Sequence, residues 1–334
     1  MAGALTRLQF GSLPIDPPLL LAPMAGISHS PFRRLLAELG GVGLFATEML
    51  SARSLPSENP RLSPFLIRTA AEHPLSYQLL ITDPREAAPA VDALAPANPQ
   101  AIDINLGCPA PRVRCRGGGS RLMQEPERAR AVVAAVRRAT PLPLSAKIRL
   151  GEQLDEAALV EFCRMVEGEG VDLITVHARL RGEPYGRTPR WGWIGMVKQA
   201  VGVPVVGNGG IFSVEDARRC LDASGCDGFM VGRGGVVRPW LFAELAAWLD
   251  GRPAPLPPAR PVLFFRFLTY LEQGLAPERR LGRLKEFTHT FSQTYPFGHT
   301  LASSVQASAT VEQARTRARR FFLASDPVGL EACG

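Results

Sequence analysis

A cysteine held in a turn of glycine and proline has the clearest chemical potential in this 334-residue sequence. It is Cys108, in the string Asn105-Leu106-Gly107-Cys108-Pro109, and it follows an apolar run that predicts a buried strand. A loop of small residues, 117–120, comes next and would let a flat or anionic ligand approach the backbone. A cysteine thiol is mostly protonated at neutral pH, so it can donate a proton as well as attack. The sequence has no Gly-x-Ser-x-Gly motif and no base beside Cys108, which favours proton donation.

Seven further apolar runs also end in residues that can bind or react. These residues are Pro23, Met24 and Ala25; Glu48; Gln78; Lys147 and Arg149; His177 and Arg179; Asn208, Gly209 and Gly210; and Gly232, Arg233 and Gly234. A purely structural sheet would carry such residues at its strand ends only sporadically, so the pattern indicates one shared site. The histidine and the glutamine can contact a flat ligand, or they can be ordinary hydrogen-bonded residues of the core.

The spacing of the apolar runs predicts the fold. They alternate with amphipathic segments such as 126–139, 155–169 and 214–224, whose apolar residues recur with helical periodicity. Eight such units predict an α/β protein with a (β/α)8 barrel, or TIM barrel, whose active site lies at the carboxyl ends of the strands. A doubly wound sheet would have fewer strands and a Gly-x-Gly-x-x-Gly turn after the first. Residues 8–15 should form a hairpin that closes the barrel bottom. The runs are 19–22, 43–46, 75–78, 101–104, 144–147, 173–176, 203–206 and 228–231.

Two strand-end loops have the composition of a phosphate site. Residues 208–210 and 232–234 follow the seventh and eighth predicted strands, where barrels often bind phosphate. Glycine exposes backbone N–H groups, and Arg233 can add a bidentate charge. Glycines that only relieve crowding are the alternative, which the presence of both loops disfavours. Lys147 ends an apolar strand, so its ammonium needs a partner, either a bound anion or a carboxylate such as Glu48.

Composition indicates a protein of a reducing cytoplasm. The chain is 46% hydrophobic, without the roughly 18-residue apolar run of a membrane span or a signal peptide. Its six cysteines include no CxxC pair, so we expect neither a disulfide scaffold nor a metal site. Apart from Cys108 they should be bystanders. Nothing in the sequence suggests an obligate assembly, so we expect a monomer that does not bind membranes.

A proline-rich linker, 251–258, ends the barrel pattern and precedes a helical region. We therefore expect a catalytic barrel over residues 1–250 and a helical RNA-binding domain over residues 259–330. From Gly251 onward there are 11 Lys and Arg against 6 Asp and Glu, which accounts for most of the net charge of +7 and favours a polyanionic partner. The helical patterns cover 262–273, 278–295, a short piece near 301, and 311–323.

Several of these motifs resemble those of the tRNA-dihydrouridine synthases, which are flavin-dependent (β/α)8 barrels with a C-terminal helical domain. The resemblance covers about residues 18–245, and the motifs around Cys108 and Gly232-Arg233 are its most specific parts. The sequence departs from the usual pattern at Leu180 and Gly210. The segments that carry the resemblance are 22–26, 103–109, 117–120, 147–151, 205–209 and 225–234.

The resemblance implies FMN as cofactor, NADPH or NADH as reductant, and tRNA as the partner. By similarity, the reduced flavin passes hydride to C6 of a uracil while Cys108, the general acid, protonates C5 from the opposite face. Asn105, Arg149 and Arg179 would bind the polar edges of the uracil. The base must be extruded from the RNA, whose phosphates would contact the basic helices. The flavin-binding residues would be Pro23, Met24, Ala25, Gln78, Lys147 and His177 for the ring and ribityl chain, and Asn208, Gly209, Gly210, Gly232 and Arg233 for the phosphate.

Two alternatives remain open at this level. A flavin barrel that acts on a free pyrimidine, as dihydroorotate dehydrogenases do, would share the phosphate loops and Lys147 but would not need basic helices. A dihydrouridine synthase that acts on another RNA would share every motif. A barrel that only binds RNA is disfavoured because it would have no use for Cys108 or Lys147. The sequence does not indicate which uridine is reduced.

Overall fold

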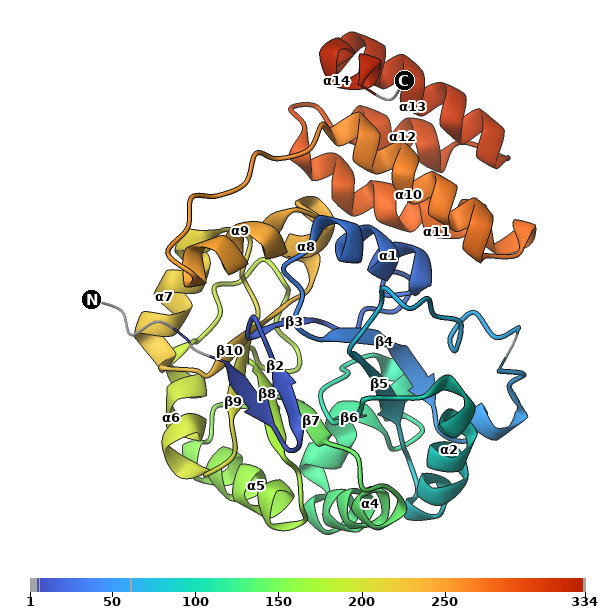
Figure 1. Ribbon diagram of the computed structural model, residues 1–334. Helices are drawn as coiled ribbons and strands as arrows, with labels where there is room; N and C mark the ends of the chain where they lie inside the picture. The colour runs from blue at the N-terminus through green and yellow to red at the C-terminus, as the bar shows by residue number, and fades with distance from the viewer. Residues whose placement is uncertain (1–4, 6, 61, 333–334) are drawn as a thin grey trace.

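The computed structural model describes residues 5, 7–60 and 62–332. Within them, eight parallel strands form one sheet in the order β3-β10-β9-β8-β7-β6-β5-β4 (Figure 1). A bridge between Leu20 and Leu44 joins the first strand to the last, so the sheet closes and the predicted (β/α)8 barrel is confirmed. The strands are β3 (Leu19–Leu21), β4 (Phe45–Ser51), β5 (Leu75–Leu80), β6 (Ala101–Asn105), β7 (Leu144–Arg149), β8 (Leu173–His177), β9 (Val205–Asn208) and β10 (Gly228–Val231).

A hairpin closes one end of the barrel, as the sequence predicted. Strands β1 (Leu8–Phe10) and β2 (Leu13–Ile15) pair antiparallel. Their buried side chains pack in one apolar cluster with Ala101 and Leu173, the first residues of β6 and β8. In Figure 1 the hairpin lies across the barrel centre. Ligands must therefore enter at the opposite end, where the strands finish.

Helices surround the barrel, and two of them begin at a side chain that caps the first turn. Ser213 caps α7 by accepting a hydrogen bond from the Asp216 N–H, and Asp155 caps α5 through the Ala158 N–H. The helices are α1 (Ser30–Leu39), α2 (Ala87–Leu94), α3 (Pro111–Arg114), α4 (Pro126–Ala139), α5 (Glu156–Gly168), α6 (Gly192–Ala200), α7 (Val214–Ser224), α8 (Arg233–Val237) and α9 (Leu241–Leu249). Short 3-10 turns are η1 (Leu55–Ser57), η2 (Pro84–Glu86), η3 (Ala95–Ala97) and η4 (Gly119–Gln124).

Most strands end later than the sequence predicted, and β4, β5 and β7 are the ones that change the place of a nominated residue. β4 continues through Glu48 and β5 continues beyond Gln78, so both residues lie inside strands rather than at their ends. Lys147 likewise lies two residues before the end of β7. The pairing of β4 with β5 shifts register between Ala46 and Met49. An irregularity of this kind changes which side chains face inward, and alternation alone does not reveal it.

Residues 252–259 contain no helix or strand and lead to a helical region that packs beside α1 and α8 (Figure 1). Its core is a set of stacked and edge-on phenylalanines that includes Phe264, Phe287, Phe291 and Phe322. The last helix was not predicted, because it has only five residues. The helices are α10 (Arg260–Gly274), α11 (Pro277–Phe291) with η5 (Ser292–Thr294), α12 (His299–Gln306), α13 (Val311–Ser325) and α14 (Pro327–Glu331).

Apolar and charged contacts join the helical region to the barrel. Phe32 of α1 packs against the ring of Phe267 with centroids 6.4 Å apart. Glu38, at the end of the same helix, accepts hydrogen bonds from Arg266 at 2.7 Å and from the Tyr270 hydroxyl at 2.6 Å. The first barrel helix is therefore the main support on which α10 rests.

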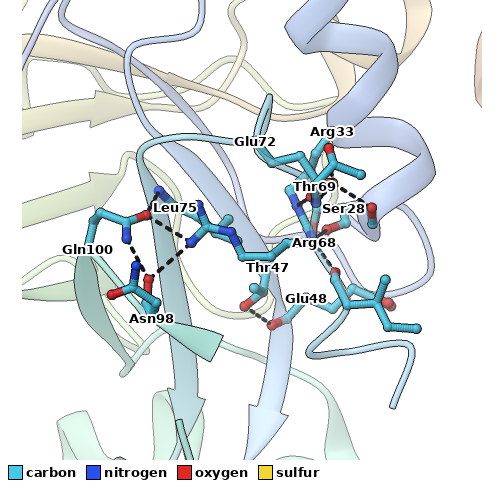
Figure 2. Close-up of polar contacts among 12 residues, drawn as sticks. Ser28, Arg33, Thr47, Glu48, Arg68, Thr69, Glu72, Leu75, Asn98 and Gln100 are labelled. Atoms are coloured by element: carbon cyan, nitrogen blue, oxygen red, sulfur yellow. Dashed lines mark hydrogen bonds and ion pairs between the residues drawn. The ribbon is translucent and has the colours of Figure 1, made fainter. Parts of the chain in front are cut away.

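A buried ion pair anchors α1 to the loop before β5. Arg33 Nε donates to Glu72 Oε2 at 2.6 Å, and the two side chains are 1% and 0% exposed. Arg33 Nη1 also donates to the Ser28 carbonyl at 2.6 Å, and the Thr69 N–H donates to Glu72 Oε1 at 2.8 Å (Figure 2). The further hydrogen bonds satisfy both charges, which a buried ion pair requires.

We expect Glu72→Ala to destabilise the protein by about 3–5 kcal/mol, because it leaves the Arg33 guanidinium buried without a counter-charge. Asp250→Ala removes a pair with Arg252 whose side chains are 53% and 61% exposed, and it should cost less than about 1 kcal/mol. Thermal unfolding followed by circular dichroism measures both variants. Equal shifts in Tm would contradict the structural importance of the buried pair.

Candidate active site at the carboxyl ends of the strands

A cavity of about 850 Å³ opens where the barrel strands end. Every residue that the sequence nominated for catalysis, cofactor binding or substrate binding lines it. These residues are Pro23, Met24, Ala25, Gln78, Asn105, Cys108, Lys147, Arg149, His177, Arg179, Asn208, Gly209, Gly210, Gly232 and Arg233. Closure of the barrel brings them together from seven of the eight strands and the loops that follow, whereas Glu48 of β4 is not among the lining residues.

The buried carboxylate of Asp103 organises the floor of this cavity. Its Oδ2 accepts a hydrogen bond from Gln78 Nε2 and its Oδ1 accepts one from Ser145 Oγ, both at 2.6 Å. Gln78 Oε1 accepts from Asn105 Nδ2 at 2.8 Å, and Asn105 Oδ1 accepts from the Cys108 N–H at 2.9 Å. An ionised carboxylate can only accept, so it determines which way both amides face. Sequence analysis gave Asp103 no role, although a charged residue in a buried strand was a usable signal.

Lys147 faces the cavity with an incomplete set of partners. Its Nζ donates to Asn208 Oδ1 at 2.9 Å. The alternative pairing with Glu48 is not observed, because that carboxylate lies instead 3.5 Å from Arg283 Nη2. Burial lowers the pKa of Lys147 to about 8, opposed by the charge of Asp103, and burial raises the pKa of Asp103 to about 6. An ammonium in this position is suited to an anionic or electron-rich ligand.

His177 is held as a neutral imidazole. Arg179 Nη1 lies 3.1 Å from His177 Nε2, and a guanidinium can only donate, so the ring proton is assigned to Nδ1. Burial, followed by the charges of the surrounding lysine and arginines, holds the pKa of His177 well below its usual value. His177 can therefore offer one N–H donor to a ligand.

Tyr185 contacts three arginines of the cavity, and the sequence analysis did not identify this residue. Its carbonyl accepts from Arg179 at 3.0 Å and from Arg233 at 3.2 Å, and its hydroxyl lies 3.4 Å from Arg149 Nη2. The Arg233 guanidinium also lies 4.4 Å from the ring centroid. The loop after β8 has no periodicity that would place Tyr185 at the site. The signal that the sequence did offer for Tyr185 was an aromatic residue close to strand ends that carry arginine.

The helical region forms one wall of the cavity. Lys285, Glu286, His289 and Thr290 of α11 line it, together with Gln306 at the end of α12. In the sequence, Lys285 is one of the 11 Lys and Arg after Gly251, and nothing there distinguishes it from the others. Which face of a helix meets the barrel is decided by tertiary packing, so no local pattern could place this wall.

The loop after β9 leaves no room for a side chain at Gly209 or Gly210. Gly209 has φ +108, and a Cβ there would lie 2.7 Å from the His177 ring, while Gly210 has φ +76. Glycine alone adopts such values readily, and it leaves the backbone N–H groups exposed to a ligand. Arg233, Lys147 and His177 line the same cavity, so the two glycine loops fit a flat cofactor that carries a phosphate, such as FMN.

Within the described ranges, no three His, Cys, Asp or Glu side chains are grouped so that they could hold a metal ion. None of the helices described is long and apolar enough to cross a membrane. Cys108 is half-buried, Cys115 is exposed, and Cys163, Cys220 and Cys226 are buried, all as free thiols. The remaining cysteine lies outside the described residues.

Known proteins of similar sequence identify the family of this chain. Residues 20–325 match the family model of the dihydrouridine synthases (Dus). The chain is 40% identical over 256 residues to a probable tRNA-dihydrouridine synthase of Rhodobacter capsulatus, covering 75% of this chain and 78% of that protein. It is 36% identical over 307 residues to the tRNA-dihydrouridine(16) synthase of Aquipseudomonas alcaligenes, covering 88% and 96%. The corresponding Pseudomonas putida enzyme is 38% identical over 291 residues, covering 83% and 88%.

Solved structures show the same fold at low sequence identity. Histamine dehydrogenase from Rhizobium sp. 4-9 superposes with a TM-score of 0.57 at 14% identity, over 80% of this chain and 51% of that one. The family match over residues 20–325 extends through both the barrel and most of the helical region. The chain therefore belongs to the dihydrouridine synthases, a family of flavin-dependent oxidoreductases.

Proposed function

We propose that this protein reduces the C5–C6 double bond of a uridine in tRNA, with FMN in the barrel mouth and NADPH or NADH as the reductant. The observation that carries the proposal is that Cys108 and the cationic glycine loops share one cavity of about 850 Å³. Such a cavity has room for a flat cofactor and for a base extruded from RNA. We place the reaction in a reducing cytoplasm and expect the protein to act as a monomer.

FMN, when bound, supplies the hydride that adds to C6 of the uracil. The protein's residues would hold and orient it. His177 would donate from Nδ1, and Lys147 would oppose negative charge on the ring. The residues facing the ring and ribityl chain would be Pro23, Met24, Ala25, Gln78, Lys147 and His177, and those holding the phosphate would be Asn208, Gly209, Gly210, Gly232 and Arg233.

Cys108 would deliver the proton to C5 of the uracil as a general acid. Its turn is held on both sides, because its N–H donates to Asn105 Oδ1 at 2.9 Å and its carbonyl accepts from the Ser120 N–H at 3.0 Å. The thiol is thereby kept at the wall of the cavity. Asn105, Arg149 and Arg179 would bind the polar edges of the base.

We further propose uridine 16 as the target. The relatives named tRNA-dihydrouridine(16) synthases align over 88% and 83% of this chain. Alignments of this length must include part of the C-terminal helices. Those helices form a wall of the cavity, so they would influence how the RNA docks and which uridine enters.

The barrel over residues 1–250 would carry the chemistry, and the helices over residues 259–330 would bind RNA. Several arginines of these helices have other partners: Arg283 lies beside Glu48, and Arg315 pairs with Glu272. The exposed arginines Arg279, Arg319 and Arg320 are better placed to contact phosphates.

The direct test is incubation of purified protein and NADPH with unmodified tRNA, followed by nucleoside mass spectrometry and mapping of the product. We expect dihydrouridine at position 16. Cys108→Ala should keep its flavin and its affinity for tRNA but lose product formation by about 100-fold or more, because the proton donor is gone. Full turnover by Cys108→Ala would contradict the general-acid role. A flavin-loaded wild type without product would contradict the proposed reaction.

Binding of FMN to the apoprotein should weaken as pH rises through about 8, because Lys147 then loses its proton and its positive charge. Lys147→Met should bind FMN more weakly at pH 7 and should lose this pH dependence. Quenching of flavin fluorescence between about pH 6.5 and 9.5 measures the affinity. Lys198→Met, which removes a lysine paired with Asp227 outside the cavity, should behave like the wild type. The assignment fails if Lys147→Met retains the decrease above pH 8.

We assign Asp103 a positioning role, since it orients Gln78 and Asn105 and, through them, the Cys108 turn. Asp103→Asn replaces an acceptor by an amide that cannot accept both hydrogen bonds, so product formation should fall roughly 10- to 100-fold. In the wild type, activity should also fall as pH drops through about 6, because protonation of Asp103 removes the same acceptor.

The pH profile separates this role from a general loss of structure. Asp103→Asn should lack the decrease near pH 6, whereas Asp172→Asn should retain it. Asp172 receives the Leu144 N–H at the start of β7, at the closed end of the barrel. If the activity of Asp103→Asn still decreased near pH 6 as in the wild type, the positioning role would be refuted.

A further inference from the structure

A second cavity, of about 640 Å³, lies beside the active site and has no part in the reaction described above. It is formed by α3, the glycine-rich loop, η4 and the first turn of α4. Four arginines line it, whereas Glu125 is the one acidic residue among its described lining. We call it the arginine groove; its arginines are Arg114, Arg116, Arg121 and Arg128.

The charges of the arginine groove are only partly balanced. Glu125 accepts from Arg121 Nε at 2.7 Å and from Arg128 Nη1 at 2.9 Å, so one carboxylate serves two guanidinium groups. Arg114 pairs with Glu152 at 2.9 Å. Arg116 is exposed at the groove. The surplus of guanidinium groups suits phosphate oxygens, which arginine can bind in a bidentate manner.

The chain segment that forms the groove also contacts the Cys108 turn. The Ser120 N–H donates to the Cys108 carbonyl at 3.0 Å. Gly119 has φ +57, and a Cβ there would lie 3.0 Å from the Cys108 Cβ, so the two segments are in close contact. A ligand in the groove would therefore lie next to the rim of the active site.

The groove and the helical region lie on opposite sides of the barrel mouth. The helical region packs on α1 and α8, which follow β3 and β10 (Figure 1). The groove follows β6, which the strand order places across the barrel from that pair. A polyanion that spans the mouth would contact cations on both sides, whereas a small ligand in the active site would not need the outer groove.

We propose that the arginine groove binds backbone phosphate of the substrate RNA, close to the uridine that enters the active site. This inference rests on the proposed function, because it takes RNA as the substrate. An extruded uridine stays covalently linked to its flanking phosphates, so these phosphates must lie near the rim of the cavity. The groove would position the RNA through charge and not through the identity of its bases.

Binding of tRNA at increasing salt concentration tests the proposal. Arg116→Ala/Arg121→Ala should reduce the steepness of the plot of log affinity against log salt by about 1.4–1.8, and affinity at about 0.1 M salt should fall on the order of tenfold. The control is Arg138→Ala/Arg218→Ala, which removes two exposed arginines from the outer helices α4 and α7 and should change the slope little. Arg116→Lys/Arg121→Lys should retain most of the wild-type slope, because the charges remain.

Cys115, an exposed thiol in the lining of the groove, allows occupancy to be measured at this place. The experiment uses Cys108→Ala/Cys333→Ser, in which the other described cysteines are buried. Saturating tRNA should slow alkylation of Cys115 by N-ethylmaleimide severalfold, and high salt should remove this protection. NADPH should give no protection.

Three results would overturn the proposal: a slope in Arg116→Ala/Arg121→Ala equal to that of the control pair, unchanged alkylation of Cys115 when tRNA is bound, or slower reduction of the flavin by NADPH with unchanged RNA binding. The last would assign the groove to a phosphate of the dinucleotide. Protection of Cys115 by tRNA in a wild-type protein that forms no dihydrouridine would support the groove and refute only the proposed reaction.

Discussion

The parallel pairing of eight strands is the constraint on which the site depends. Because parallel strands run in one direction, their carboxyl ends meet at one mouth. The register then makes neighbours of the residues that matter: Asn105 pairs with Lys147, Arg149 with His177, and His177 with Asn208. A slip of one residue in any of these pairs would turn a side chain from the mouth toward the helices.

Burial of polar groups at this mouth has an energetic cost that hydrogen bonds must offset. A series of hydrogen bonds runs from Asp103 through Gln78 and Asn105 to the Cys108 turn. It satisfies these polar groups and also gives each amide one orientation. Around these hydrogen-bonded residues, the cationic side chains that line the cavity outnumber the acidic ones. Burial, reinforced by these positive charges, keeps His177 neutral, and burial also lowers the pKa of Lys147 against the opposing charge of Asp103.

The two sides of the barrel mouth are formed by different parts of the chain. On one side, Glu38 holds α10 against the barrel, and Phe32 and Glu48 hold α11. On the other side, the arginine groove is built from the segment that follows Cys108 in sequence. The element that carries the acid and the element that would hold the RNA backbone are therefore one continuous piece of chain, so the position of one is coupled to that of the other.

The sequence by itself determined the barrel, the closing hairpin, the cysteine turn and the glycine loops. Each of these depends on local properties: the spacing of apolar runs, the residues of a turn, and the positive φ that glycine allows. Tertiary structure alone decided the longer course of β4, the pairing of Glu48 with Arg283 rather than Lys147, the contacts of Asp103 and Tyr185, and the helical wall of the cavity. These features depend on register and on contacts between segments far apart in the chain, and such contacts leave no periodic trace in the sequence.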